Sequence, residues 1–481
     1  MLHPSSWSTQ DLWDSIFTGR KAPIRPECGA ISPRCVAQYL FEMDLQMFWI
    51  TLAAILFATQ PTPTGGPLAP AIPQAVEASA PLTPVAAPAK PTAYELIDAG
   101  KFDELAERKP KTLLKELRKG RKLAKFLPGQ SRRDLDDGFG RETDLYLYVP
   151  RKPSGVLILL HGLQGNGGQL IEYYQKLAER AGLIIAAPTA QKLGKTKNED
   201  WNETSDQLMH WWSYRPKGFA LTALSQLKKE FPIHENRVYI SGYSMGGFGS
   251  WNLGLRFPDR FAAAAPVAGG ISMREYQIER DDQIRKLVPN AVQLPFYFIH
   301  GDSDNTVSPR FDRMTRDELR KLRVPHEYVE VPRGSHFLDM RPEGTIMKSL
   351  SSWMLKKVRN PHPRGIRFHS FGEYMNQCYW IRIDEFEGES PATVTATIGK
   401  RNKISIETEG ASKITVFLDE KLIKLKSKVE IEVNGMPAFK DRVKEDSKVI
   451  VESWRAREDR ELLYSAKVQI DVAALADSSH E

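Results

Sequence analysis

A serine lies between two glycines in the stretch "GYSMG" (residues 242–246), with an apolar run before it and small, helix-compatible residues after it. A serine at such a strand-to-helix turn adopts a strained backbone conformation, and glycines two positions before and after it leave room where side chains would clash. The turn raises the hydroxyl of Ser244 to the N-terminus of a helix, where the backbone N–H of Met245 points at a developing oxyanion. Ser244 is therefore a predicted nucleophile, and Met245 is a predicted oxyanion-hole donor.

A nucleophilic serine needs a base and an orienting acid, and two later strand ends offer both. The stretch "PFYFIHGDSDNTVSP" contains Asp302 and Asp304, and "HEYVEVPRGSHFLDM" places His336 in a Gly-Ser loop. Since the carboxyl ends of parallel strands meet at one edge of a sheet, these residues are expected beside Ser244. We predict His336 as the general base and one of the two aspartates as the acid that fixes its tautomer. This chemistry requires no metal and no cofactor.

A glycine-rich loop after an earlier strand, "LILLHGLQGNGG", is expected to supply the second oxyanion donor. We predict the backbone N–H of Leu163 as this donor, with that of Gln164 as the alternative. His161 in the same loop and His300 in a later strand are expected to shape their loops rather than to react.

Aromatic side chains are the candidates for contacting a substrate. Tyr243 lies next to the nucleophile, and Trp211 and Trp212 lie in the connection that precedes the nucleophile strand. Because aromatic residues line many ligand pockets, all three are predicted substrate-binding residues. Core packing is the alternative for the two tryptophans.

Short apolar strands and amphipathic helices alternate from about residue 141 to residue 358, and these elements would position the site. Near-continuous apolar strands separated by helices predict an α/β fold, with a mostly parallel sheet covered by helices on both faces. After this region, alternating strands without regular helices between them predict a small β-rich C-terminal domain.

The N-terminal part of the chain has a different composition. Residues 47–58 form an apolar run that is too short for a membrane span and fits a signal peptide, and the Pro/Ala-rich tract after it is typical of a spacer. The predicted location is therefore secreted or periplasmic, and an uncleaved run would tether the chain to a membrane. We predict six segments: an N-terminal extension or mis-assigned start (1–45), the signal-peptide-like segment (46–58), a linker (59–91), two short amphipathic helices packed on the next domain (92–136), the α/β domain (137–360) and the β-rich domain (361–481).

Composition excludes some classes of function. The net charge of +7 comes largely from a lysine-rich patch between Lys101 and Lys125. Without a zinc-ligand spacing or a basic stripe interleaved with aromatic residues, this patch predicts a solvated face and no nucleic-acid binding. Of the three cysteines, only Cys378 follows the hydrophobic segment, so an exported chain would form no internal disulfide.

Taken together, the motifs resemble those of the α/β-hydrolase superfamily. The motifs that carry the resemblance are "HGLQGNGG" (161–168), "GYSMGGFGSW" (242–251), "HGDSDNTV" (300–307) and "GSHF" (334–337). Within the superfamily, residues 137–358 are similar to secreted bacterial esterases of the polyhydroxybutyrate-depolymerase and feruloyl-esterase type, and to their prolyl-oligopeptidase-like relatives. The family pattern His-Gly-x-x-Asp-x-x-Val implies that Asp304, and not Asp302, is the acid.

The resemblance implies a serine hydrolase that cleaves carboxylic esters, of small molecules or of polymers, through an acyl-serine intermediate. One alternative is a prolyl-oligopeptidase-like peptidase, although that group usually carries a large N-terminal propeller, which the short stretch before the hydrolase strands does not resemble. The other alternative is a catalytically inactive binding protein that uses its β-rich C-terminal domain.

Overall fold

The computed structural model describes six stretches of the chain, namely residues 90–136, 142–190, 218–271, 285–372, 375–388 and 391–477. The chain divides into two units between Ala89 and Lys90, and the described residues all belong to the second unit. The predicted segments up to residue 89 therefore lie outside the described residues.

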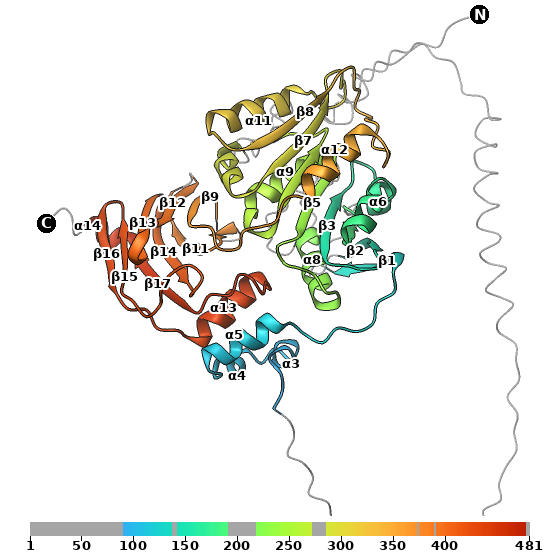
Figure 1. The fold of residues 1–481 in the computed structure, drawn as a ribbon. Helices are drawn as coiled ribbons and strands as arrows, with labels where there is room; N and C mark the ends of the chain where they lie inside the picture. The colour runs from blue at the N-terminus through green and yellow to red at the C-terminus, as the bar shows by residue number, and fades with distance from the viewer. Residues whose placement is uncertain are drawn as a thin grey trace, which may run out of the picture. The chain divides into compact units, whose positions relative to one another are not determined.

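Eight strands form one sheet around which the site is built (Figure 1). They are β1 (Gly129–Asp136), β2 (Glu142–Val149), β3 (Gly155–Leu160), β4 (Leu183–Pro188), β5 (Val238–Tyr243), β6 (Ala263–Val267), β7 (Phe296–Gly301) and β8 (His326–Val331). Their order along the sheet is β1-β2-β4-β3-β5-β6-β7-β8. Strand β2 pairs antiparallel with β1 and β4, and all later neighbours pair in parallel. This mostly parallel sheet confirms the predicted α/β-hydrolase fold.

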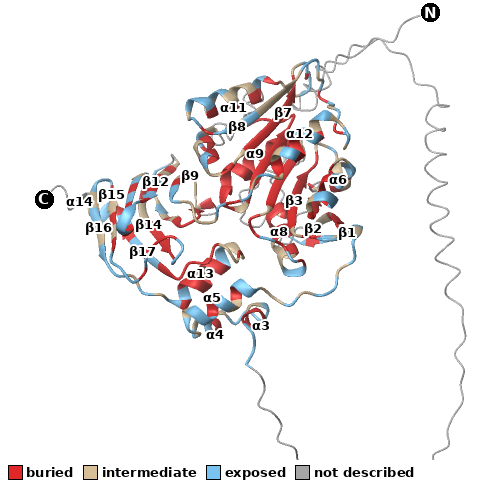
Figure 2. Cartoon of the chain, in the orientation of Figure 1, coloured by how far each residue is buried: buried red, intermediate tan, exposed pale blue. Residues whose placement is uncertain are grey.

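Helices cover both faces of the sheet. They are α6 (Ile171–Ala181), α8 (Phe219–Glu230), α9 (Met245–Arg256), α11 (Arg310–Lys321) and α12 (Thr345–Met354), with 3-10 turns at Gly167–Leu170, Pro258–Arg260 and Val288–Gln293. Successive strand residues point to opposite faces. In β3, Val156, Ile158 and Leu160 therefore join the core under α8, α9 and α11, whereas Leu157 and Leu159 join the core under α6 and α12. Figure 2 shows the resulting burial along the strands and along α9, which is buried throughout.

Two further sheets enclose a second core in the C-terminal region, which confirms its predicted β-rich character. Their strands are β9 (Gly365–Ser370), β10 (Gln377–Cys378), β11 (Ile381–Phe386), β12 (Ala392–Ile398), β13 (Lys403–Glu409), β14 (Ala411–Leu418), β15 (Val429–Val433), β16 (Met436–Asp441) and β17 (Ala466–Asp471), and they are accompanied by α13 (Ser447–Arg457), α14 (Val472–Asp477) and a 3-10 turn at Lys400–Asn402. The four-stranded sheet has the order β10-β11-β14-β17, and the five-stranded sheet has the order β16-β15-β13-β12-β9. Cys378 in β10 is buried, and this burial raises the pKa of its thiol.

The helices before the sheet differ from the prediction for residues 92–136. There are three of them, α3 (Ala93–Asp98), α4 (Phe102–Ala106) and α5 (Pro110–Lys119), and the same range also contains β1. Their buried side chains, such as Leu113 and Leu117, pack against Ile450 and Trp454 of α13 rather than against the domain that follows them in the chain. The predicted packing partner was therefore wrong.

Two glycines end helices in this stretch, Gly100 after α3 and Gly120 after α5. Gly100 and Gly120 have φ angles of 69° and 82°, a left-handed region that favours glycine and ends a helix. The apolar periodicity continues through Phe126, but α5 ends before Gly120, and the ring of Phe126 instead packs against Phe231 at a centroid distance of 5.6 Å.

Buried charges join the segment after α12 to the segment after α13. The guanidinium of Arg359 is paired with the carboxylate of Asp459 at 2.8 Å, and each side chain is 1% exposed. The ammonium of Lys228 lies 3.5 Å from the same carboxylate and 2.9 Å from Glu235. Burial opposes ionisation of Asp459, but the charges of Arg359 and Lys228 outweigh burial and lower its pKa. The Asp459 carboxylate therefore neutralises two buried cations.

Replacing Asp459 by asparagine is expected to lower the free energy of unfolding by about 3–5 kcal/mol, because it leaves the buried guanidinium of Arg359 without its counter-charge. Urea denaturation of the wild type and the variant measures this difference. The matched control is Glu458→Gln, since Glu458 forms only an exposed pair with Lys229 at 3.6 Å, and its change should stay below about 1 kcal/mol. Equal, small effects of both substitutions would show that the buried cluster does not stabilise the fold.

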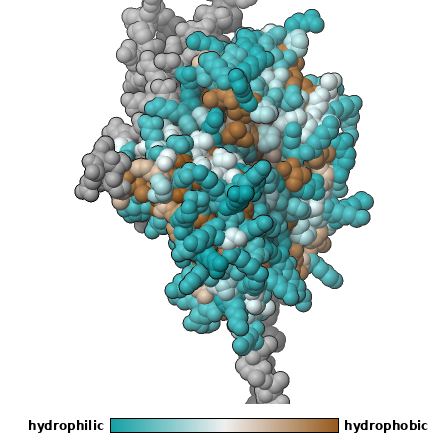
Figure 3. Space-filling view, turned by 60° about the vertical axis from the view of Figure 1, so that its left-hand side comes forward, coloured by the Kyte–Doolittle hydropathy of each residue, from teal (hydrophilic) through white to brown (hydrophobic). Residues whose placement is uncertain are grey.

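Hydrophilic side chains dominate the face drawn in Figure 3, with smaller hydrophobic areas between them. The large apolar residues that are exposed, among those the structure describes, are Leu127, Val292, Phe337 and Val358. No helix in the described stretches is both long enough and apolar enough to cross a membrane.

Candidate active site

Ser244 occupies the turn between β5 and α9. Its backbone has φ 55° and ψ −117°, a conformation that residues with a side chain rarely adopt. Hydrogen bonds hold this turn on both sides: the N–H of Ser244 donates to Val267 at 2.9 Å, and its carbonyl accepts from the N–H of Phe248 at 3.1 Å. Met245 is the first residue of α9, and the first N–H groups of a helix have no partner within the helix. The predicted strand-to-helix turn is therefore present.

Glycine is required on both sides of this serine because backbone atoms approach closely. A Cβ atom on Gly242 would lie 2.3 Å from the carbonyl oxygen of Gly246, and one on Gly246 would lie 2.0 Å from the carbonyl oxygen of Leu160. The spacing of the motif thus reflects the close packing of α9 on β3 and β5, which also directs the N-terminus of α9 toward the edge where these strands end.

Three polar side chains meet at this edge of the sheet. The Nε2 atom of His336 lies 3.0 Å from the Oγ atom of Ser244, and its Nδ1 atom lies 2.7 Å from Oδ2 of Asp304. His336 and Asp304 are 7% and 5% exposed, so their hydrogen bond is largely shielded from water. The structure thus brings together the serine, histidine and aspartate that the sequence placed after three different strands.

The two candidate aspartates have different surroundings. Asp304 accepts hydrogen bonds at Oδ1 from the N–H groups of Thr306 and Val307, at 2.8 and 2.9 Å, and its Oδ2 faces His336. The carboxylate of Asp302 instead accepts a hydrogen bond from the exposed hydroxyl of Ser303 at 2.7 Å. Of the two, Asp304 is the one that contacts the histidine.

Asp304 is held in its ionised form. Burial alone would raise the pKa of its carboxyl group. Hydrogen bonds from His300 and His336, followed by those from the two backbone N–H groups, outweigh this effect and keep the pKa well below its usual range. A carboxylate in this state can fix the tautomer of His336 and stabilise its imidazolium form.

The loop after β3 lies against the serine. A Cβ atom built on Gly162 would be 3.5 Å from the Cβ atom of Ser244, so the backbone just before Leu163 contacts the nucleophile turn. His161 fixes the loop: its Nδ1 bonds to the carbonyl of Gly162 at 2.6 Å, and its Nε2 accepts from the N–H of Ala190 at 2.8 Å. Burial lowers the pKa of His161 to about 4, so the ring is neutral and can accept this bond.

Tyr243 holds the loop that carries the histidine. Its hydroxyl donates to the backbone carbonyl of His336 and accepts from the N–H of Leu338, the latter at 2.8 Å. Burial raises the pKa of the Tyr243 hydroxyl to about 12. The hydroxyl is thus engaged by the protein, and the substrate-binding role of Tyr243 stays a prediction. Trp211 and Trp212 lie outside the described residues.

Sequence reasoning did not single out Phe337 and expected His300 only to shape its loop. Phe337, directly after the histidine, is 84% exposed, and its ring is edge-on to that of His336 at a centroid distance of 5.5 Å. His300 lies with its Nε2 atom 3.3 Å from Oδ2 of Asp304. Its place in the same "HGDSD" stretch as the two aspartates was the signal that could have indicated this contact.

Comparison with known proteins identifies an esterase family for part of the chain. Residues 137–331 match the family model described as "Putative esterase". This match confirms the resemblance to esterases of the α/β-hydrolase superfamily for that part of the chain, which we call the esterase-like domain.

Two curated relatives and one solved structure illustrate the likeness. The chain is similar to part of a bifunctional acetylxylan esterase/xylanase from Neocallimastix patriciarum, with 26% identity over 178 residues, 36% of this chain and 23% of the relative. An uncharacterized secreted protein from Arthroderma benhamiae is 32% identical over 209 residues, 38% of this chain and 22% of the relative. The chain thus spans less than a quarter of the length of either relative. The structure of an S-formylglutathione hydrolase from Staphylococcus aureus aligns with a TM-score of 0.37 and 19% identity, over 47% of this chain and 98% of that one.

Proposed function

We propose that the protein is a serine hydrolase that cleaves carboxylic esters, with Ser244 as nucleophile, His336 as general base and Asp304 as the orienting acid. The observation that carries the proposal is the continuous hydrogen-bonded series from Ser244 through His336 to Asp304, with distances of 3.0 and 2.7 Å. The match of residues 137–331 to an esterase family supports an ester as the substrate.

The geometry supports a two-step acyl transfer. The Oγ atom of Ser244 attacks the ester carbonyl carbon while His336 Nε2 takes the hydroxyl proton, and the carbonyl oxygen becomes an oxyanion. When this intermediate collapses, the bond to the alcohol breaks, and the alcohol leaves with the proton from His336. Water then attacks the acyl-serine in the same way, and His336 returns the proton to Ser244. The products are the carboxylic acid and the free enzyme.

We assign the backbone N–H groups of Met245 and Leu163 to the oxyanion. Support for Met245 comes from its place at the N-terminus of α9, directly after the nucleophile. Support for Leu163 comes from the contact of its neighbour Gly162 with Ser244. Each such donor contributes on the order of 3 kcal/mol to stabilisation of the transition state, because the site places it before charge develops.

The substrate is proposed to be an ester of a small molecule or of a polymer at the cell exterior or in the periplasm. The exposed ring of Phe337 offers an apolar surface beside the reacting atoms. Similarity to a secreted protein supports export, as does the signal-peptide-like composition of residues 46–58.

Labelling with a fluorophosphonate tests the proposal. The full chain is expected to form an adduct on the peptide that contains Ser244, and mass spectrometry locates it. Ser244→Ala should abolish the adduct, whereas the control Ser335→Ala, which changes an exposed serine next to His336, should leave it unchanged. A wild-type chain that is not labelled would contradict the proposal and favour the inactive binding protein. Among p-nitrophenyl acetate, a feruloyl ester and an aminoacyl amide, faster turnover of the amide would favour the peptidase.

A further inference from the structure

A second histidine lies behind the candidate triad. His300, at the end of β7, is fully buried. Its Nδ1 atom is 2.8 Å from Oδ2 of Asp312, and its Nε2 atom is 2.9 Å from the carbonyl oxygen of Val307 and 3.3 Å from Oδ2 of Asp304. All three partners are hydrogen-bond acceptors, so each ring nitrogen of His300 must carry a proton to bond to them. A neutral imidazole carries a proton on only one nitrogen, whereas an imidazolium carries one on both. The surroundings of His300 therefore favour its imidazolium form.

Asp312 supplies the counter-charge for this imidazolium. It is fully buried in α11, and its Oδ1 atom accepts a hydrogen bond from the indole N–H of Trp251 at 3.2 Å. Trp251 belongs to α9, the helix that begins directly after Ser244. The polar groups thus form a continuous series from Trp251 through Asp312, His300, Asp304 and His336 to Ser244, which directly precedes α9.

We propose that His300 is a positioning residue for the reaction: balanced by Asp312, it fixes the carboxylate of Asp304 in the orientation and charge state that His336 requires. The inference rests on the proposed function of the triad. Oδ2 of Asp304 is shared by the two histidines, and Oδ1 is held by two backbone N–H groups, so the carboxylate cannot rotate without losing several hydrogen bonds. His300 acts through Asp304 and does not touch the reacting atoms.

The charge state of this histidine agrees with the geometry. Burial opposes the charged ring, but hydrogen bonds to Asp304 and Asp312 outweigh burial and raise the pKa of His300 to about 10. Burial raises the pKa of Asp312, against the effect of its hydrogen bond with His300. The ring therefore stays positively charged throughout the range in which an ordinary histidine, with a pKa of about 6.5, titrates.

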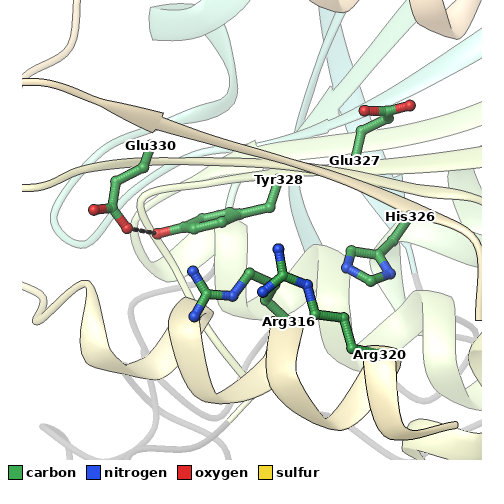
Figure 4. A pocket seen from close by; sticks show the side chains of 6 residues that line it. All are labelled: Arg316, Arg320, His326, Glu327, Tyr328 and Glu330. Carbon is green, nitrogen blue, oxygen red and sulfur yellow. Dashed lines mark hydrogen bonds between the residues drawn. The ribbon is translucent and has the colours of Figure 1, made fainter. Parts of the chain in front are cut away.

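Other polar and charged groups near His300 and Asp312 form hydrogen bonds and ion pairs with one another. The hydroxyl of Tyr328 in β8 donates to Glu330 at 2.7 Å (Figure 4). Arg313 pairs with the same carboxylate at 2.8 Å. Arg316 lies over the ring of Tyr328 at 5.5 Å. These groups line or border an outer pocket of about 540 Å³ that includes none of the three triad residues. The charges that directly contact His300 are thus those of Asp304 and Asp312, with His336 on the far side of Asp304.

The pH profile of kcat/KM for His300→Gln distinguishes positioning from a purely structural role. Without the positive charge behind Asp304, the acid limb should move up by at least about half a pH unit, because the Asp304 carboxylate then attracts a proton onto the triad more strongly. We also expect kcat to fall by about 10- to 100-fold, since a displacement of about 1 Å at a reacting centre can cost about 100-fold.

The control is His326→Gln, which alters a histidine of the neighbouring strand whose Nδ1 bonds only to a backbone carbonyl, that of Val324. Its profile should match that of the wild type. Fluorophosphonate titration counts the active sites in every sample. If His300→Gln only lowers the number of active sites, with kcat per site and the acid limb unchanged, the inference is wrong. A wild-type chain that does not react with the fluorophosphonate would instead contradict the proposed function itself.

A measurement on the unaltered protein covers the case in which the variant does not fold. In a chain labelled with ¹⁵N-histidine, one imidazole should remain protonated at both nitrogens at pH 8.5, about two units above the pKa of an ordinary histidine. Both ring nitrogens of this histidine should give signals of the protonated type. If every histidine is neutral at that pH, the inference is overturned.

Discussion

Ser244→Ala is expected to lower kcat for ester hydrolysis by about 10⁵- to 10⁶-fold, with little change in stability. The Oγ atom is the only heavy atom lost, and it is the proposed nucleophile, 3.0 Å from His336 Nε2. Turnover of p-nitrophenyl acetate by the purified full chain measures the effect. Thermal unfolding shows whether the variant remains folded.

A variant that combines Ser244→Ala with His336→Ala tests whether the two residues act together. If Ser244 and His336 act as one unit, His336→Ala should cost nearly as much as Ser244→Ala, and the double variant should cost no more than the larger single effect. The control Ser303→Ala alters an exposed hydroxyl of the Asp302 loop and should change kcat by less than about twofold. Multiplicative losses in the double variant would show that the two residues do not work together.

The sequence was sufficient for the α/β fold because the sheet is buried on both faces. In β3 and β4 each residue is buried, and a strand in that environment is a short, continuous apolar run bounded by polar or glycine-rich loops. The site was predictable for a related reason. Ser244 and Asp304 follow such runs, in β5 and β7, whereas His336 follows β8, whose residues are only partly buried. Parallel strands bring the carboxyl ends of all three to one edge.

Contacts between distant segments could not be predicted in this way. The packing of α3 to α5 on α13 depends on residues more than three hundred positions apart, and each helix shows only that it has an apolar face. Strand β16 is an edge strand that contains Pro437, so it does not resemble a regular strand in sequence.

The same limit applies within the site. Tyr243 was predicted to contact the substrate because it is adjacent to Ser244, yet its hydroxyl bonds to the backbone around His336, about ninety residues later. The alternation of side chains along β5 places Tyr243 and Ser241 on the same face of the sheet, and from that face Tyr243 reaches the histidine loop. Sequence spacing gave the position of Tyr243 but could not give the partner of its hydroxyl.

The acid of the triad is tested by a matched pair of substitutions. Asp304→Asn is expected to lower kcat by about 10⁴-fold, because an amide cannot both accept from His336 Nδ1 and carry the charge that stabilises the imidazolium. It also leaves the buried, positively charged His300 without one of its two carboxylates. Asp302→Asn changes the same chemical group two residues earlier, where the carboxylate accepts a hydrogen bond from Ser303, and kcat should fall by less than about threefold.

Steady-state turnover of one ester by both variants, corrected for active sites by fluorophosphonate titration, provides the comparison. The ratio of the two kcat values should exceed about 10³, since only Asp304 shares a hydrogen bond with the base. A larger loss in Asp302→Asn would assign the acid to the other aspartate. Because the hydrogen bond between His336 and Asp304 is shielded from solvent, the loss in Asp304→Asn should also change little with ionic strength, unlike an effect that arises from exposed charges.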